Sequence, residues 1–445
     1  MMSKTNRLKA LVLAATLGSS VAGGCLPEDA SESPALGDGA VFADTDGSIV
    51  VYRRMTRDAI EFAALFRVDP VSEKQTFIGD ISELDFGAEM FIVESGYAFH
   101  DEDDFLLYGR DGVRTAVGKA STFAESVRIS GDRGYLLATV RESSAAPPIR
   151  VGVVDGSTME VHELEATAGT IAGAAFAHQS DALYVGYYET ATGKGHLLRW
   201  DIDAVKAGGY VIDPATGLFA DPNLDVELGL TLSPEVEVVV SPNDKFVSVA
   251  GLGVVMPYTG RPALDVVDIL SGAVREVDLA SPGTTFTFDD AYLVYTDETG
   301  ETLYSLELGD ETSTLKATGV GTESYAVSKT SNHIVETWDS TVGPIPLVGV
   351  VRQPIAGDFI LGRYLFLPGA KMYSVATPLG GDSVLQNLDL TTGKVTTPFV
   401  GDFSSGMTLL PSGSVVLSDT TAKTLTIVDP ATDTVTKTLP IPTLQ

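Results

Sequence analysis

The last part of the chain, residues 404–445, places the strongest constraint on what it can fold into. Four short apolar runs follow one another there, at residues 406–410, 415–417, 425–428 and 435–439. β-Branched residues fill the runs, and Pro, Gly, Asp, Ser and Thr fill the gaps, which predicts a four-stranded antiparallel meander. Such a small sheet has two faces to bury and is not stable alone, so it needs further copies of itself.

Two segments of the chain carry a resemblance to a repeat class. They are Val428-Asp-Pro-Ala-Thr-Asp-Thr-Val435 and Leu388-Asp-Leu-Thr-Thr-Gly-Lys-Val395. Both match the pattern of YVTN-type repeats, in which an Asp follows one strand and a Val opens the next. The unit therefore resembles a blade of the YVTN-type and quinoprotein-like β-propellers of bacteria. This resemblance implies a fold and no particular chemistry.

The same strand–turn–strand junction recurs along the chain. Its acidic residues are Asp69, Asp111, Asp155, Asp201, Asp268, Glu307, Asp389 and Asp429, at steps of 42, 44, 46, 67, 39, 82 and 40 residues. A period near 42 is that of a four-stranded propeller blade. The step of 82 equals two periods and indicates a degraded blade around residues 333–351.

We therefore predict an all-β fold, a β-propeller of four-stranded blades over residues 40–442. Eight clear junctions and one doubtful one favour eight blades, with seven as the alternative. Two separate β-sandwiches would not produce so steady a step without a linker. The step of 67 predicts a loop insertion at about 204–234. Such a surface loop either carries function or is a tolerated insertion without one. Deletion of such a loop should cost little stability.

The N-terminal segment has the features of a lipoprotein signal. Lys4, Arg7 and Lys9 precede an apolar run, residues 10–21, that is too short to span a membrane comfortably. Val21-Ala-Gly-Gly-Cys25 resembles a bacterial lipobox, which implies cleavage after residue 24 and acyl chains, such as palmitate, on Cys25. The alternative is a buried free cysteine after an ordinary cleavage site. Cys25 is the only cysteine, so a disulfide within the chain is excluded.

The N-terminal segment also indicates where in the cell envelope the protein is located. Residues 25–39, rich in Glu, Asp, Ser, Pro, Ala and Gly, predict a flexible tether between the lipid and the propeller. Leu26 stands after the cysteine, where an Asp often signals retention in the inner membrane, so the resemblance favours the outer membrane. Its periplasmic and cell-surface sides remain alternatives.

The chain is strongly acidic, with a formal net charge of −31. Removal of the signal takes away three cations and no anion, so the mature chain carries −34. Nucleic-acid binding needs a cationic surface and is excluded. A solvated acidic surface is the expectation, with halotolerance or a basic protein partner as alternatives.

No catalytic, cofactor-binding or metal-binding residue is predicted. The chain has no Gly-x-Ser-x-Gly motif, and its five histidines lack metal-ligand spacing; they are His100, His162, His178, His196 and His333. The acidic run 100–104, and the pairs in 44–47 and 289–290, are interpreted as hairpin turns rather than calcium ligands. Residues 389–394 resemble a blade of quinone-dependent dehydrogenases, but only Trp200 and Trp338 are present, so the docking Trp repeat of that family is missing.

Three classes of function remain. A non-catalytic binding or scaffolding propeller, lipid-anchored in the bacterial envelope and recognising a protein or small ligand, is favoured. The lipoprotein of the outer-membrane β-barrel assembly machinery is similar in anchor and length, although its Trp-containing repeats are absent here. The alternatives are a ligand-handling lipoprotein of an import system, for instance for iron chelates, and a propeller enzyme, lactonase-like or quinone-dependent.

Overall fold

The computed structural model describes most of the chain between residues 38 and 443. The residues in that range that it does not describe are 58–59, 82–83, 85–87, 103, 121–123, 142–148, 230–235, 252–262, 279–282, 289–291, 298–301, 309–313, 319–324, 328–332, 337–343, 347–362, 377–382, 402 and 404–405. The expected signal, most of the tether, Cys25 and the acidic pair at 289–290 therefore lie outside the described residues. Among the helices that are described, none has the length and apolarity needed to cross a membrane.

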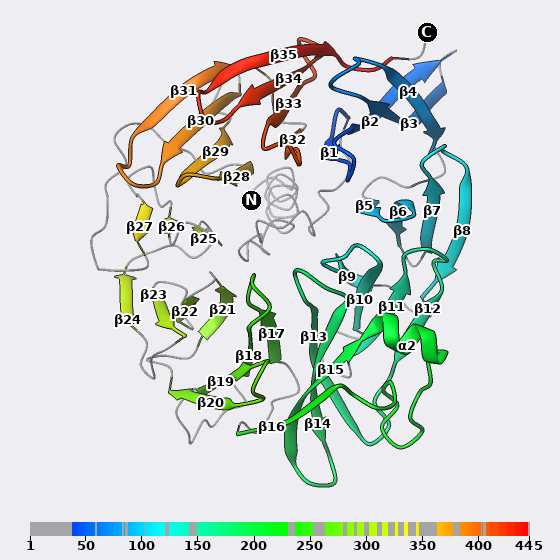
Figure 1. Cartoon of the computed structure of the whole chain (residues 1–445), viewed down its shortest axis with the longest axis vertical. Coiled ribbons are helices and arrows are strands. Elements are labelled where there is room, and N and C mark those ends of the chain that lie inside the picture. The colour runs from blue at the N-terminus through cyan, green and yellow to red at the C-terminus, as the bar shows by residue number, and fades with distance from the viewer. Residues whose placement is uncertain are drawn as a thin grey trace, which may run out of the picture.

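The described strands form a ring of small sheets, seen down its axis in Figure 1. Each sheet is an antiparallel meander whose strands follow chain order from the inside of the ring to the outside. Among the described residues there are nine such meanders, eight with four strands and one with three. The predicted all-β propeller with four-stranded blades is confirmed.

The first four blades hold sixteen strands. Blade 1 consists of β1 (Val41–Ala43), β2 (Ile49–Arg57), β3 (Ile60–Val68) and β4 (Gln75–Asp80). Blade 2 consists of β5 (Glu89–Val93), β6 (Gly96–Asp101), β7 (Asp104–Gly109) and β8 (Arg114–Lys119). Blade 3 consists of β9 (Ala124–Ile129), β10 (Tyr135–Arg141), β11 (Ile149–Asp155) and β12 (Val161–Leu164). Blade 4 consists of β13 (Gly169–Phe176), β14 (Ala182–Glu189), β15 (Lys194–Asp201) and β16 (Leu224–Leu228). Blades 3 and 4 are joined into one sheet by a single pairing, Ile149 with Ile171.

The other five blades complete the ring. Blade 5 consists of β17 (Val236–Val240), β18 (Phe246–Gly251), β19 (Ala263–Asp268) and β20 (Val274–Asp278). Blade 6 consists of β21 (Gly283–Phe288), β22 (Tyr292–Asp297), β23 (Thr302–Glu307) and β24 (Thr314–Thr318). Blade 7 has β25 (Tyr325–Val327), β26 (His333–Glu336) and β27 (Pro344–Pro346). Blade 8 consists of β28 (Arg363–Leu367), β29 (Lys371–Ala376), β30 (Val384–Asp389) and β31 (Val395–Val400). Blade 9 consists of β32 (Gly406–Leu409), β33 (Val415–Asp419), β34 (Thr424–Asp429) and β35 (Thr434–Pro440).

The number of blades corrects the favoured count of eight and the alternative of seven. The doubtful junction in the step of 82 residues is a separate sheet, β25–β27, so the described residues hold nine blades. All eight clear junctions were correct. Seven and eight are common closure numbers for propellers, but the doubtful ninth junction corresponds to a blade of its own.

The core of the propeller lies between neighbouring blades. One cluster joins blades 2 and 3 and includes Phe105, Leu107, Ile129 and Leu136. Comparable clusters join blades 1 and 2, 3 and 4, 4 and 5, 5 and 6, and 8 and 9. Among the described residues, the blades on both sides of these clusters therefore bury their faces against neighbouring blades, as the isolated meander requires.

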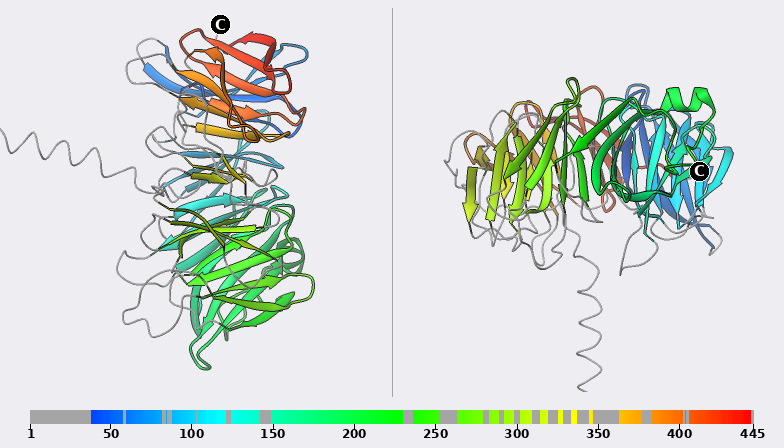
Figure 2. Two further views of the ribbon diagram at one scale, coloured as in Figure 1. Left: turned by 90° about the vertical axis from the view of Figure 1, so that its left-hand side faces the viewer. Right: turned by 90° about the horizontal axis from the view of Figure 1, so that it is seen from below.

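The recurring acidic residues build the turn between the third and fourth strands. At Asp155 the side chain accepts the backbone N–H of Ser157 at 2.8 Å, and the backbone carbonyl accepts the N–H of Met159 at 2.8 Å. In five of these turns the residue four positions after the Asp is left-handed, with φ of 59° at Met159 and 68° at Gly272 for example. These turns, and those between the first and second strands, open on one face of the ring, here called the upper face. Turns between the second and third strands open on the opposite, lower face, and Figure 2 shows the ring edge-on.

Blades 1 and 9 meet where the ring closes, and they are separate sheets because each is built from its own consecutive strands. The ring is therefore closed by packing between these two blades. Val41, Ile49 and Phe66 of blade 1 share a buried cluster with apolar residues of blade 9 such as Leu425. Gln75 Nε2 of blade 1 also donates to the carbonyl of Pro440 at 2.8 Å, and Arg53 and Lys437 make similar bonds across this seam.

The segment expected as an insertion, 204–234, is described over residues 204–229. It follows Asp201, whose side chain caps the short helix α2 (Ile202–Gly208) by accepting the N–H of Ala204 at 3.1 Å. It then returns through β16, which is a strand of blade 4. Between them, Leu218 and Phe219 are 1% and 2% exposed and pack in the cluster shared by blades 3 and 4. The insertion is therefore a packed cap, and the expectation that it could be deleted at little cost in stability has to be revised.

Candidate functional site

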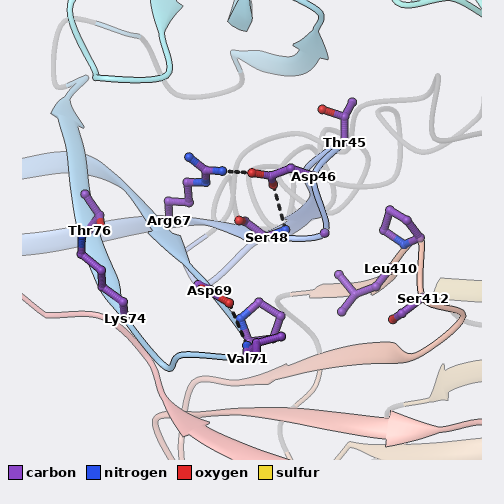
Figure 3. Close-up of a pocket in the computed structure, with 13 residues that line it drawn as sticks. Thr45, Asp46, Ser48, Arg67, Asp69, Val71, Lys74, Thr76, Leu410 and Ser412 are labelled. Carbon is purple, nitrogen blue, oxygen red and sulfur yellow. Dashed lines mark hydrogen bonds and ion pairs between the residues drawn. The ribbon is translucent and has the colours of Figure 1, made fainter.

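A pocket of about 750 Å³ lies on the upper face where the first and last blades meet. Its walls are the β1–β2 turn (residues 45–48), the β3–β4 turn (69–74) and the start of the β32–β33 turn (410–412), together with Arg67 and Thr76. Figure 3 shows these side chains, and we call the site the seam pocket. Segments from the two ends of the described chain are brought together here.

Two carboxylates of the seam pocket hold its turns in place. Asp46 accepts the backbone N–H of Ser48 at 3.0 Å and forms an ion pair with Arg67. Asp69 accepts the N–H of Val71 at 2.8 Å and the hydroxyl of Ser72 at 2.5 Å. The side-chain hydrogen bond from Ser72, followed by those from the backbone, lowers the pKa of Asp69 below its usual range. Asp69 therefore stays ionised near neutral pH and is suited to structure rather than proton transfer.

The rest of the lining offers contact surface to a ligand. Lys74, Thr76 and Ser412 are exposed, and contribute an ammonium group and two hydroxyls. Val71, which is 86% exposed, and Pro411 add apolar surface beside them. A pocket with dispersed hydrogen-bonding groups and a small apolar area fits the binding of a small polar ligand or of a loop from a partner.

An ion pair between a buried carboxylate and a partly exposed arginine supports the pocket from the side of blade 2. Asp44 is 0% exposed, and both of its carboxylate oxygens contact Nη1 of Arg110. The hydroxyl of Tyr97 donates to Asp44 at 3.0 Å, and the backbone N–H of Thr45 donates at 2.7 Å. Burial, and then the charge of Asp44, raise the pKa of Tyr97, so its hydroxyl stays protonated and keeps donating. Because Thr45 lines the pocket, this network fixes the β1–β2 turn against blade 2.

The network was not predicted from the sequence. The hairpin turn predicted at residues 44–47 is present between β1 and β2. Asp44 and Arg110 are 66 residues apart, and no local pattern marks their pairing. Only the placement of both residues at upper-face turns of neighbouring blades, Asp44 between β1 and β2 and Arg110 between β7 and β8, could have suggested it.

A second polar cluster lies under the α2 cap. One carboxylate oxygen from each of Asp132, Asp181 and Asp203 lies within 4.8 Å of the others. The hydroxyl of Tyr135 donates to Asp203 at 2.6 Å, and the backbone N–H of Asp203 donates to Asp181 at 2.6 Å. Burial, together with the neighbouring carboxylates, raises the pKa of Asp181. Three carboxylates fall short of the six to eight oxygens that Ca²⁺ takes, and we assign no ion to them.

Asp155 fastens the cap to blade 3. Its side chain pairs with Nζ of Lys206 in α2 at 2.6 Å and accepts the hydroxyl of Tyr210 at 3.3 Å. Burial of Asp155 tends to raise its pKa, but hydrogen bonds from Lys206 and Ser157 outweigh burial and lower the pKa to about 2. The ring of His162 stacks on that of Tyr210 with centroids 3.6 Å apart. The cap is thus held by polar as well as apolar contacts.

The histidines have separate partners. His100 stacks on Phe105, His162 stacks on Tyr210, a ring nitrogen of His178 bonds the carbonyl of Val240 at 2.9 Å, and one of His196 bonds Asp225 at 2.8 Å. The structure does not bring these four together, and the side chain of His333 lies outside the described residues. The acidic run 100–104 ends β6 and begins β7, with Glu102 in the lower-face turn between these paired strands, so the predicted hairpin is present.

The known proteins that resemble this chain share little sequence with it. No protein-family model matches the chain, and no curated protein matches it. Among solved structures, BamB from Moraxella catarrhalis is 12% identical, with a TM-score of 0.41 over 78% of this chain and 96% of that one. Apo AztD from Citrobacter koseri is 12% identical, with a TM-score of 0.41 over 77% of this chain and 93% of that one. Dipeptidyl peptidase 4 from Porphyromonas gingivalis is 10% identical, with a TM-score of 0.45 over 92% of this chain and 60% of that one.

The ring of four-stranded meanders makes this chain a β-propeller. Similarity at these levels of identity carries no information on activity, because propellers support many unrelated functions.

Proposed function

We propose that this chain is a lipid-anchored, non-catalytic binding or scaffolding propeller of a bacterial envelope, and that it recognises a protein or a small polar ligand at the seam pocket. The anchor is the lipid on Cys25 implied by the lipobox resemblance, and the outer membrane is the favoured location. The propeller ring carries the binding site.

The seam pocket is the observation that carries the binding half of the proposal. Its two carboxylates hold its turns, and the remaining groups at its mouth, Lys74, Thr76 and Ser412, are exposed. The β1–β2 turn in its wall is held by the contact of the buried Asp44 with Arg110. A preorganised surface of this kind loses little side-chain and loop entropy on binding, which favours recognition.

Photo-crosslinking tests the binding half. A photoreactive amino acid at Ser412, in the pocket, is compared with one at Ala191, an exposed residue in the lower-face turn of blade 4, in the bacterium that encodes the protein. We expect a discrete adduct from position 412 that is absent from position 191. Adducts of equal yield from both positions, or none from position 412, would contradict the pocket as the recognition site.

Labelling with palmitate tests the anchor. Wild-type protein should be labelled and pellet with membranes, while Cys25→Ser should be neither labelled nor membrane-bound. Globomycin, which blocks the lipoprotein signal peptidase, should leave the signal attached to the wild type. Persistent palmitate label on Cys25→Ser would refute the lipid anchor.

A further inference from the structure

The described chain enters the ring well below its upper face. β2 begins at Ile49, beside the upper-face turn that lines the seam pocket, and runs downward. Asp38 accepts the Nε–H of Arg53 at 2.9 Å and the backbone N–H of Arg54 at 2.8 Å. Arg53 and Arg54 lie four and five residues beyond Ile49, which places Asp38 about 13–17 Å below the turn, at ~3.3 Å per residue.

The entry point also lies near the axis of the ring. Gly39 pairs with Tyr52 by an N–H to O hydrogen bond of 2.9 Å, so the chain at this point extends the edge formed by β1. β1 is the innermost strand of blade 1 (Figure 1). A tether attached here hangs from the inner part of the ring on its lower side.

The length of chain between Cys25 and Asp38 limits how the ring can sit on a bilayer. Thirteen residues span at most about 45 Å when fully extended. A flexible chain of that length has a root-mean-square span of about 20 Å. To turn the upper face toward the bilayer, the tether would have to pass around the ring or across its thickness, which is ~20–30 Å for strands of six to nine residues. If the lower face is toward the bilayer, the tether reaches the bilayer without passing around or across the ring.

From this geometry we infer that the lower face of the propeller faces the membrane and that the upper face, with the seam pocket and the α2 cap, faces the aqueous compartment. The inference rests on the proposed lipid anchor at Cys25. Glu102 lies in a lower-face turn and Glu189 is the last residue of β14 beside another. Their charges repel anionic head groups, so the lower face stays away from the bilayer by a distance that the tether sets. The partner of the seam pocket is therefore a water-soluble ligand, or a protein that approaches from the aqueous side, and not a lipid of the anchoring leaflet.

Two single-cysteine variants test the orientation in the full lipidated protein. Ala191→Cys lies in the lower-face turn between β14 and β15, and Leu270→Cys lies in the upper-face turn between β19 and β20, where Leu270 is 98% exposed. The two positions are on adjacent blades, so they differ mainly in height. Cys25 is the only native cysteine and its sulfur is occupied by lipid, so each introduced thiol is labelled alone.

Each variant is labelled with a donor dye and bound to phosphatidylcholine vesicles that contain a trace of acceptor-labelled phosphatidylethanolamine. We expect energy transfer from position 191 to exceed that from position 270 at least about twofold, because the two labels differ in height by ~20–25 Å. Equal or reversed transfer, with the protein still floating with the vesicles, would overturn the orientation alone. Transfer from neither position, with no flotation, would overturn the anchor and the orientation with it.

Discussion

Phe219→Ala should destabilise the propeller by about 3–5 kcal/mol, the usual cost of truncating a buried aromatic side chain. Phe219 belongs to the insertion between β15 and β16, yet it is only 2% exposed and makes an edge contact with Trp200 at 6.1 Å between ring centroids. The lost transfer free energy alone is about 2–3 kcal/mol. A cavity beside the large, buried Trp200 adds the remainder, because the surrounding strands are paired on both sides and relax little.

The matched control is Val211→Ala in the same insertion. Val211 is 58% exposed, so its truncation should change stability by less than about 0.5 kcal/mol. Urea denaturation followed by tryptophan fluorescence measures both variants, with Trp200 as a reporter beside the mutated site. A loss below about 1 kcal/mol for Phe219→Ala would show that the insertion is the removable loop that its turn-rich sequence suggests, and that its packing on blades 3 and 4 contributes little. By the same reasoning, deletion of residues 206–223 removes Leu218 and Phe219 from the core and should lower the melting temperature clearly.

Three further outcomes follow from the seam, the cap and the domain boundaries. Gly406→Val should open the seam and lower the melting temperature, because a Cβ at Gly406 would lie 2.9 Å from the backbone nitrogen of Val41. The control Gly208→Ala should be tolerated, because a Cβ there would have no atom within 4 Å. Equal melting temperatures for the two variants would contradict the close packing of β1 on β32. Asp155 has a pKa of about 2 in the folded protein against ~3.9 unfolded, so the stability it supplies is complete above the unfolded value and is lost as the pH falls toward 2. Asp155→Asn should therefore lose less stability than the wild type on acidification from about pH 5, and parallel acid curves would argue against the ion pair with Lys206. Limited proteolysis should leave residues 40–442 as one resistant fragment, and a stable boundary inside that range would show separate domains.

The sequence alone determined the local architecture of this protein. An Asp at the end of a third strand caps its own turn through N–H groups two and three residues away, as Asp389 does for Thr391 and Thr392, so the signal and the structure it specifies lie within five residues. The alternation of such turns with apolar runs was enough to predict an all-β chain of four-stranded meanders at a period near 42. The count failed at β25–β27, where no acidic junction marks the blade.

The tertiary structure decided which residues meet around the ring. The seam pocket joins residues 45–48 with 410–412, and Asp44 finds Arg110 in the next blade, although nothing near either residue announces the other. Phe219 is buried because the insertion folds back over blades 3 and 4, whereas its flanking Asp-Pro turns indicated only an exposed loop. Turn and strand preferences act over a few residues, but closure of the ring and burial of the cap depend on contacts between blades, and these exist only once every blade is in place.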